Sequence, residues 1–389
     1  MKESTKIIRI QTDRTQHKEH ATPLFLTSSF TFEDAGEGKA LFNNEIEGNI
    51  YSRYSNPSVQ EFIDKVCMME GVEEGFATSS GMAAVFAGFA AHLKNGDHLV
   101  SCKALFGSAH QIITQILSKW GITYTYVNSD ATEQEWEAAV KENTKMIYLE
   151  TPSNPGLELV DLEMIGRIAK KHGLIYYIDN CFATPAIQKP AAYGADLIVH
   201  SATKFMDGQG RVLGGIICGS KEMMEPVVFF CRHTGPAMSP FNAWVLSKSL
   251  ETFYLRMERH CSNALALAKA LQTMPGITKV NYPFLEDFSQ VELAKKQMKN
   301  GGALVTFDIE GGFDRVIKMT KLLKIPSKTS NLGDSRTTIT NPNTTTHSKV
   351  AQELKDELGI TEGLMRVSVG LEDIEDLIED FRQALEGSK

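Results

Sequence analysis

The chain has 389 residues, of which 42% are hydrophobic and 23% charged, and its formal net charge is −8. This length predicts about two domains with large buried cores, and acidic charge spread without a basic block argues against a nucleic-acid partner. No segment approaches the roughly 20 uninterrupted apolar residues of a membrane helix, and the first residues lack the apolar core of an export signal. We therefore expect a cytoplasmic protein with small-molecule partners and no membrane partner.

Apolar strands alternate with helical patterns between residues 56 and 220. A helix opens at Asn56-Pro57, with proline at its first position, and stops at Gly71. Strands are then predicted at 76–79, 97–102, 122–127, 145–150, 174–179, 196–199 and 214–218, and helices at 80–94, 109–120, 133–141 and 161–172. Strands separated by helices in this way form a mostly parallel sheet buried on both faces.

The pattern changes after Pro240, where a long amphipathic stretch reaches about Leu271 without a strand signal. Beyond it we expect a strand at 302–309, a helix at 313–323, a Ser/Thr/Asn-rich loop at 327–348, a helix at 349–358, a strand at 364–369 and a helix at 372–385. The prediction is thus an α/β fold in three parts: an N-terminal arm (1–55), a ligand-binding domain (56–240) and a smaller α+β domain (241–389). Because the arm has few helix or strand signals, it needs something to pack on, such as another subunit.

The cysteines and histidines give no sign of a metal site. The six cysteines stand singly, without C-x-x-C spacing, and most lie inside apolar segments. The ten histidines show no metal-ligand spacing. We expect buried thiols and no metal.

Polar groups follow several strands at their carboxyl ends, where open parallel sheets bind ligands. Residues 79–82 join a strand to a helix, and free N–H groups at a helix start favour phosphate. Asp179 closes one strand, and Ser201, Thr203 and Lys204 follow another. Taken singly, each group has an ordinary explanation as a cap, a turn residue or a solvated side chain. Together they supply a phosphate pocket, a carboxylate and a lysine, which is the set that pyridoxal phosphate requires.

Seven motifs, in this order, resemble the signature of the pyridoxal-phosphate enzymes of Cys/Met metabolism, which include cystathionine synthases and lyases, methionine γ-lyases and homoserine-ester sulfhydrylases. They are Tyr51-Ser-Arg53, Ser80-Gly-Met82, Glu150-Thr-Pro-Ser-Asn-Pro155, Asp179-Asn180, His200-Ser-Ala-Thr-Lys204, Asn331-Leu-Gly-Asp334 and Gly363-Leu-Met-Arg-Val-Ser-Val-Gly-Leu-Glu372. The resemblance covers nearly the whole chain. It implies the type I, aspartate-aminotransferase-like fold of the PLP-dependent transferases, pyridoxal 5'-phosphate as cofactor, and a homotetramer of two tight dimers.

The resemblance also implies a role for each motif residue. Lys204 would carry the cofactor as a Schiff base, and Asp179 would pair with the pyridinium nitrogen. The groups that would hold the phosphate are the N–H groups of Gly81 and Met82, the hydroxyls of Ser201 and Thr203, and Tyr51 and Arg53 of the neighbouring subunit. Arg366 would bind the substrate carboxylate through its planar fork, with Asn154 beside it.

Two positions, Phe106 and Asn331, depart from the usual family pattern, and Ser108 departs from the pattern of one branch. Phe106 stands where a tyrosine usually stacks on the cofactor, and phenylalanine stacks but cannot carry a proton. Ser108 stands where methionine γ-lyases tend to have a cysteine, and Asn331 replaces the usual serine in the substrate-carboxylate pocket. Phe106 and Asn331 in these places are typical of the O-succinylhomoserine sulfhydrylase branch, with O-acetylhomoserine enzymes close by.

The expected reaction is therefore γ-replacement on O-succinyl- or O-acetylhomoserine by sulfide, giving homocysteine for methionine biosynthesis, with Lys204 as general base. A methionine γ-lyase or a cystathionine γ-synthase or lyase of the same family is the alternative, and the acyl group stays open. A nicotinamide-dependent dehydrogenase is disfavoured. The glycines of residues 208–214 are spaced one residue too far apart for a dinucleotide loop, and the segment leads into a strand instead of a helix.

Overall fold

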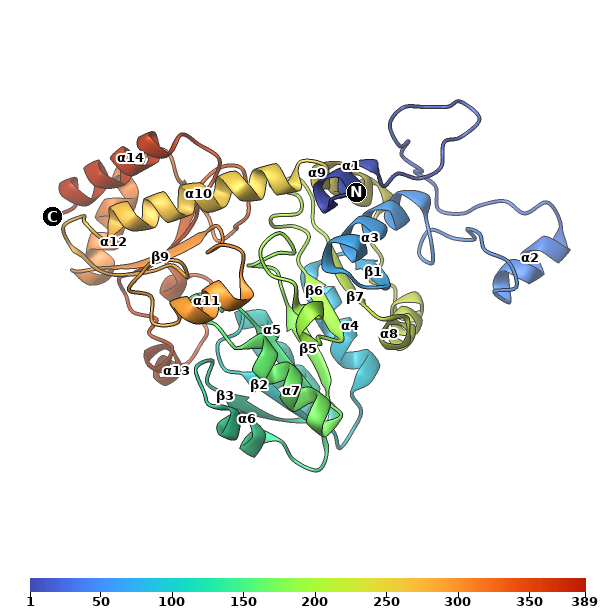
Figure 1. Cartoon of the computed structure of the whole chain (residues 1–389), viewed down its shortest axis with the longest axis horizontal. Helices are drawn as coiled ribbons and strands as arrows, with labels where there is room; N and C mark the ends of the chain where they lie inside the picture. Colours follow the sequence, from blue (N-terminus) through green and yellow to red (C-terminus); the bar gives the residue numbers. More distant parts are fainter.

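A seven-stranded sheet forms the centre of the ligand-binding domain in the computed structural model, which describes residues 1–389 (Figure 1). Its strand order is β1-β7-β6-β5-β4-β2-β3. The strands are β1 (Glu74–Thr78), β2 (His98–Cys102), β3 (Thr123–Val127), β4 (Thr144–Glu150), β5 (Ile175–Asp179), β6 (Leu197–His200) and β7 (Gly215–Gly219). Strands β2 to β6 pair in parallel, and β7 runs antiparallel to both of its neighbours. The predicted mostly parallel sheet is confirmed, and each strand begins and ends within two residues of its predicted place.

Helix α3 (Pro57–Glu70) begins and ends where local signals predict. The Asn56 side chain accepts a hydrogen bond from the N–H of Ser58, and Pro57 occupies the first helical position. Gly71 ends the helix with a φ of 77°, a left-handed conformation that glycine adopts at little cost. The apolar face of α3 packs against β1 and β7.

The helices between the strands follow the prediction with two differences. Three helices were predicted and are present: α4 (Gly81–His92), α6 (Glu133–Ala139) and α7 (Leu162–His172). The first difference is an unpredicted helix after the last strand, α8 (Lys221–Thr234). The single helix expected at 109–120 is instead α5 (Gly107–Gln111), a π-helical turn (Ile112–Ile116) and a 3-10 turn (Leu117–Trp120). Periodicity places apolar residues on one face but does not show a change of helical pitch, so the sequence could not reveal this division.

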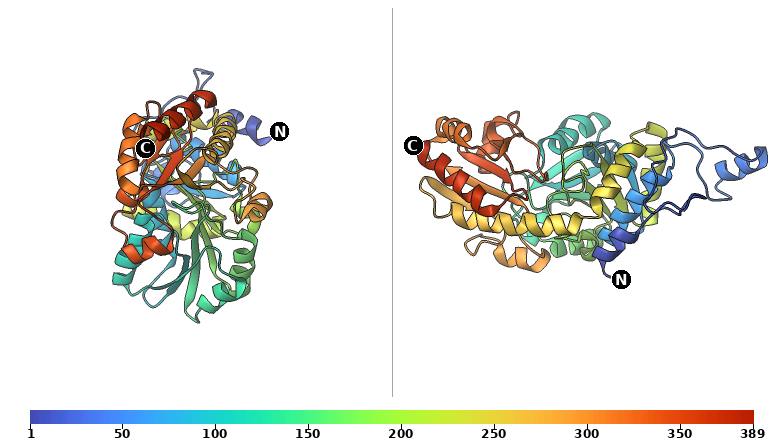
Figure 2. Two further views of the ribbon diagram at one scale, coloured as in Figure 1. Left: turned by 90° about the vertical axis from the view of Figure 1, so that its left-hand side faces the viewer. Right: turned by 90° about the horizontal axis from the view of Figure 1, so that it is seen from above.

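The arm of residues 1–55 begins with a helix on the body of the molecule and then extends away from it (Figures 1 and 2). It contains two short helices that were not predicted, α1 (Glu3–Arg9) and α2 (Ala35–Phe42). Helix α1 packs against α3 through the buried Ile7, whereas α2 lies at the far end of the arm (Figure 1). Leu26 and Phe42 are 70% and 61% exposed. The arm therefore presents apolar side chains that the rest of this chain does not cover.

A second sheet, of five strands, forms the core of the C-terminal domain, with strand order β10-β11-β12-β9-β8. The strands are β8 (Ile277–Asn281), β9 (Leu304–Ile309), β10 (Ser327–Lys328), β11 (Thr338–Thr340) and β12 (Leu364–Ser368). The helices are α9 (Pro240–Leu250), α10 (Phe253–Leu271), α11 (Val291–Gln297), α12 (Gly312–Leu322), α13 (Gln352–Glu357) and α14 (Ile374–Gly387). The division of the chain at residue 240 stays a prediction, since α9 packs against α3 of the preceding domain.

The long helix α10 runs beside both parts of the molecule, and the second sheet faces the carboxyl ends of the first (Figures 1 and 2). None of the helices combines the length and the apolar character needed to cross a lipid bilayer. All six cysteines are free thiols, and five of them are buried, as predicted.

Candidate active site

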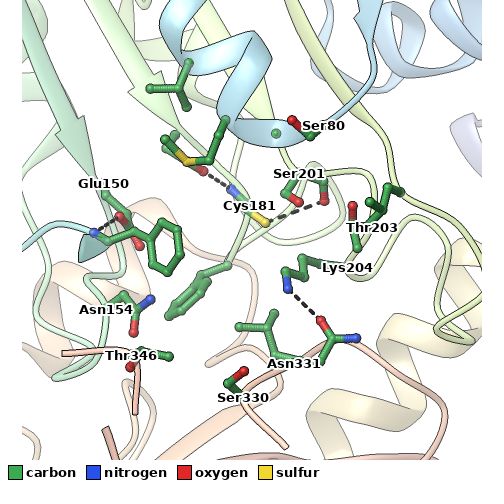
Figure 3. A pocket seen from close by; sticks show the side chains of 18 of the residues that line it. Ser80, Glu150, Asn154, Cys181, Ser201, Thr203, Lys204, Ser330, Asn331 and Thr346 are labelled. Carbon is green, nitrogen blue, oxygen red and sulfur yellow. Dashed lines mark hydrogen bonds between the residues drawn. The ribbon is translucent and has the colours of Figure 1, made fainter. Parts of the chain in front are cut away.

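A cavity of about 360 Å³ lies between the carboxyl ends of β4 to β6, the start of α4 and loops of the C-terminal domain (Figure 3). Ten of the twelve predicted site residues line it: Gly81, Met82, Phe106, Asn154, Asp179, Ser201, Thr203, Lys204, Asn331 and Arg366. The other two lie elsewhere. Tyr51 and Arg53 line a separate depression beside residues 237–240, and Arg53 donates to the carbonyl oxygen of Arg232.

The first turn of α4 offers unpaired donors to the cavity. The Ser80 side chain caps the helix by accepting from the N–H of Ala83 at 3.2 Å, while the N–H groups of Gly81 and Met82 donate to no other group of the chain. A Cβ added to Gly81 would lie 2.6 Å from the Cβ of Ser201, so glycine alone permits this close approach. The helix dipole and these free donors favour an anion such as phosphate.

Thr203 lies beside this cradle, but its hydroxyl is already engaged. It donates to the carbonyl oxygen of Gly214 at 3.2 Å and accepts from the N–H of the same residue at 3.1 Å. These bonds tie the loop that carries Lys204 to the segment leading into β7. A phosphate contact from Thr203 stays a prediction from the sequence.

Asp179 closes β5 at the floor of the cavity. One carboxylate oxygen, Oδ1, accepts from the N–H of Cys181 at 2.9 Å. Burial raises the pKa of this carboxyl to about 6, although that hydrogen bond and the charge of His200 act in the opposite direction. A cation opposite the carboxylate would relieve the cost of burying it, and a protonated ring nitrogen meets this requirement.

Lys204 projects from the loop after β6 toward the C-terminal domain (Figure 3). Its Nζ donates to Oδ1 of Asn331 at 2.6 Å. Burial lowers the pKa of the amine, and the charge of Arg366 lowers it further, against an opposing effect of Cys181. Both effects increase the fraction of neutral amine, which is the form that attacks an aldehyde or accepts a proton.

Gly333 fixes the backbone at the lysine. Its φ is +77°, and an added Cβ would lie 2.5 Å from the nitrogen of Phe205 and 2.7 Å from the carbonyl carbon of Lys204. The loop of the C-terminal domain therefore touches the main chain of the lysine loop directly, and glycine is the residue that this contact requires.

Arg366, on β12, is 2% exposed and has its guanidinium fixed by two bonds. One NH2 group (NH1) donates to Oδ1 of Asn154 at 2.9 Å, and the other (NH2) donates to the carbonyl oxygen of Ser330 at 3.0 Å. Burial lowers its pKa to about 10, with Glu150 opposing, so the group stays cationic at neutral pH. A fixed guanidinium facing a cavity is suited to binding a carboxylate.

Among the cavity residues to which the sequence analysis gave no role, Glu150 and Cys181 carry ionisable groups. Glu150 (Figure 3), 4% exposed at the end of β4, accepts from the N–H of Phe106 at 2.8 Å and so holds the backbone of a residue that lines the cavity. Burial and the nearby Asp179 raise its pKa. Cys181 is the one cysteine that lines the cavity. An acidic residue that closes an apolar strand drew attention to Asp179, and the same signal could have identified Glu150.

These groups fit pyridoxal phosphate. The free N–H groups of Gly81 and Met82 match a phosphate, and the buried carboxylate of Asp179 matches a ring nitrogen that bears a proton. Lys204 offers an amine of lowered pKa, and the ring of Phe106 lies in the same cavity for stacking.

Comparison with known proteins places the chain among enzymes that use this cofactor. Residues 4–386 match the family model described as Cys/Met metabolism PLP-dependent enzyme. The chain is 44% identical to the O-succinylhomoserine sulfhydrylase of Pseudomonas aeruginosa over 98% of its length and 94% of that protein. It is 40% identical to the L-methionine gamma-lyase of Fusobacterium nucleatum over 94% of this chain and 93% of that one.

A solved structure gives the same result for the fold. The putative O-acetylhomoserine (thiol)-lyase of Campylobacter jejuni, which contains a pyridoxyl-lysine monophosphate, has a TM-score of 0.95 and 30% sequence identity over 99% of this chain and all of that one. The predicted type I fold and the predicted pyridoxal phosphate cofactor are confirmed.

Proposed function

The chain belongs to the pyridoxal-phosphate-dependent enzymes of Cys/Met metabolism, and we propose that it catalyses γ-replacement on an O-acylated homoserine, with sulfide as nucleophile and homocysteine as product. The observation that carries the proposal is the meeting of Lys204, Asp179 and Arg366 in one cavity, in a chain whose similarity extends over nearly all of a sulfhydrylase. We place this activity in methionine biosynthesis and in the cytoplasm.

The residues of the cavity divide the work of the reaction. Bound pyridoxal phosphate supplies an electron-withdrawing ring that stabilises negative charge at the α-carbon of an amino acid. Arg366, held by Asn154, binds the α-carboxylate and so fixes the orientation of the substrate. The Lys204 amine, with its lowered pKa, accepts the α-proton, and Asn331 holds that amine in place between transfers.

Phe106 favours an acylated substrate. Its ring faces the cavity but has no hydroxyl, so it cannot donate a proton to a leaving group. A carboxylate released from an ester is a stable anion and leaves without being protonated. A free thiolate, the leaving group from methionine or cystathionine, is more basic and gains more from an acid at this position.

The arm supports assembly into the predicted homotetramer. Tyr51 is 41% exposed, and neither Tyr51 nor Arg53 lines the cavity of its own chain. Apolar side chains exposed along the same arm gain free energy when a second copy covers them. We propose that Tyr51 and Arg53 reach the phosphate in a neighbouring subunit. An R53A variant should then bind the cofactor more weakly, and light scattering should give a tetramer.

A substrate panel tests the proposed reaction. Purified enzyme loaded with pyridoxal phosphate is offered O-succinylhomoserine, O-acetylhomoserine, cystathionine and methionine, each with and without sulfide. We expect homocysteine from the two esters when sulfide is present and no product with the K204A control. Rapid release of a thiol from methionine, without any requirement for sulfide, would contradict replacement and establish a γ-lyase.

A further inference from the structure

A buried ionisable pair lies behind the cofactor site and takes no part in the steps described above. His200 is the last residue of β6, and Glu70 is the last residue of α3. The Nε2 atom of His200 is 2.5 Å from Oε1 of Glu70, and the two side chains are 2% and 0% exposed. A carboxylate buried to this degree requires a partner, because its loss of hydration is otherwise uncompensated.

The pair holds both chain segments that carry cofactor-facing residues. The same Glu70 oxygen accepts from Nδ2 of Asn180 at 2.9 Å, and Asn180 directly follows Asp179. His200 directly precedes Ser201, which lies against the start of α4. The Glu70 carboxylate therefore links the segment that carries Asp179 with the segment that begins at Ser201, beside the first turn of α4.

Glu70 has few partners in its surroundings. His200 is the one basic side chain within ion-pair distance of Glu70, and the second oxygen of Glu70 is buried without a hydrogen bond. The other ionisable groups that face Glu70 are the thiol of Cys218 on β7 and the hydroxyl of Tyr254 on α10. A hydrogen bond with Cys67 and burial raise the pKa of Cys218, and burial raises that of Tyr254, so both are neutral at neutral pH. His200 and Asn180 are therefore the partners on which the buried Glu70 carboxyl depends.

We propose that Glu70 and His200 are positioning residues for the cofactor: the Glu70 carboxylate pairs with His200 and holds Asn180, and this pair keeps Asp179 in place opposite the ring nitrogen. The charge of His200 also lowers the pKa of Asp179, against the effect of burial. The inference rests on the cofactor and is independent of the choice between replacement and elimination.

Three single variants and one double variant test the proposal in the full-length protein. E70Q and H200Q each remove one charge and keep a polar side chain, and E61Q is the matched control. Glu61 also lies in α3, is 3% exposed and pairs with Lys65 at 3.0 Å, but it does not line the cavity. Equilibrium dialysis gives the dissociation constant of pyridoxal phosphate from the cofactor-free protein, and visible absorbance followed across neutral pH reports the protonation of the bound cofactor.

We expect E70Q and H200Q each to raise the dissociation constant of pyridoxal phosphate about tenfold, because groups that support a ligand-contacting residue tune how well it binds. Both variants should shift the pH of the absorbance transition in the same direction as each other. The double variant should be no worse than either single variant, because both changes break the same pair. E61Q should lower the melting temperature and leave binding and absorbance unchanged. If E70Q and H200Q altered only stability, as E61Q does, or if their effects on binding added in the double variant, the proposal would be wrong.

H200Q alone decides the question if E70Q does not fold, because glutamine still donates to Glu70 but carries no charge. An unchanged dissociation constant and an unchanged absorbance in H200Q would overturn the proposal. Both readouts are obtained without substrate, so a failure of the sulfhydrylase assignment would leave this result intact.

Discussion

The amine of Lys204 donates to Oδ1 of Asn331 at 2.6 Å, so a loop of the ligand-binding domain and a loop of the C-terminal domain meet at the reactive nitrogen (Figure 3). The amide oxygen accepts this bond without carrying charge. A carboxylate in the same place would stabilise the ammonium form and raise the pKa of the lysine. Asn331 therefore orients the amine and preserves the lowered pKa that burial produces.

Replacing Asn331 separates these two effects. We expect N331A to lower kcat about tenfold, because the amine loses its acceptor and its orientation, while the cofactor still binds and gives its visible absorbance. N331D keeps an acceptor but adds charge, so the basic group should titrate at higher pH and the rise in activity should move in that direction. Rate–pH profiles of the two variants measure this difference. Identical profiles for N331D and wild type would show that Asn331 does not act on the lysine.

Gly333 gives a second test of the same contact. G333A combines an unfavourable φ with a Cβ that meets the Lys204 backbone. In G173A the glycine also has a positive φ, of 63°, but nothing lies within 4 Å of the added Cβ. Both variants should lose about 1 kcal/mol of stability from backbone strain. Only G333A should also lose activity and covalent cofactor, which borohydride reduction and mass spectrometry of the lysine peptide would detect. Equal activity in the two variants would contradict the contact.

The boundaries of α3 and the strands could be predicted because their signals are local. Asn56, Pro57 and Gly71 each act on the residues next to them. Helix α1 has no side-chain cap, and its contacts reach Lys189 and Tyr254, nearly 200 residues away or more. Stabilisation by such distant partners leaves no local pattern, so α1 was not predicted. Helix α2 does have a local signal, since the Asp34 side chain accepts from the N–H groups of Gly36 and Glu37, but it was not recognised from the sequence.

The site residues also differ in whether local signals or distant packing determine their place. Motifs that follow strands identified the phosphate cradle at the start of α4, Asp179 and the Lys204 loop, because the carboxyl ends of parallel strands meet at one edge. The other four predicted residues that line the cavity came from the family resemblance: Phe106, Asn154, Asn331 and Arg366. The engagement of the Thr203 hydroxyl by Gly214 and the hold of Glu150 on Phe106 depend on how loops pack. Glu70 was also unremarkable in the sequence, where it reads as the last residue of a helix; only the fold brings it to His200, 130 residues away.

Glu61 should make the folded chain sensitive to acid. Burial raises the pKa of this carboxyl, but a hydrogen bond from Ser247, the N–H of Thr12 and the charge of Lys65 outweigh burial and lower it from 4.5 to about 2. Since the folded-state pKa is the lower one, the stability that Glu61 contributes is present above pH 4.5 and is lost as the pH falls toward 2. E61Q should cost about 3 kcal/mol at neutral pH, because the buried Lys65 amine loses its partner at 3.0 Å and keeps only the carboxylate of Glu251, at 3.6 Å.

Chemical denaturation of wild type and E61Q at several pH values measures this effect. The difference in unfolding free energy between the two proteins should shrink as the pH falls below 4.5. A difference that stayed constant down to low pH would show that the carboxylate charge contributes nothing at this position.

Asp179 should have the opposite effect on the stability of the cofactor-free protein. Burial raises the pKa of its carboxyl from 3.8 to about 6, so the contribution of Asp179 to stability is complete below pH 3.8 and is lost as the pH rises through 6. D179N replaces the carboxylate with an amide of the same shape that cannot ionise. Without cofactor, D179N should therefore melt at a higher temperature than wild type above pH 6, and the two should converge at acid pH.

The same D179N substitution should weaken cofactor binding. An amide gives no charge to a protonated ring nitrogen, so D179N should bind pyridoxal phosphate more weakly than wild type, and the cofactor should raise its melting temperature less. Thermal melts with and without pyridoxal phosphate, across the same pH range, measure both effects. If D179N were less stable than wild type at neutral pH without cofactor, the buried Asp179 carboxylate would not destabilise the cofactor-free protein, and the prediction would be wrong. The opposite result would identify Asp179 as a position where the fold gives up stability to hold the cofactor.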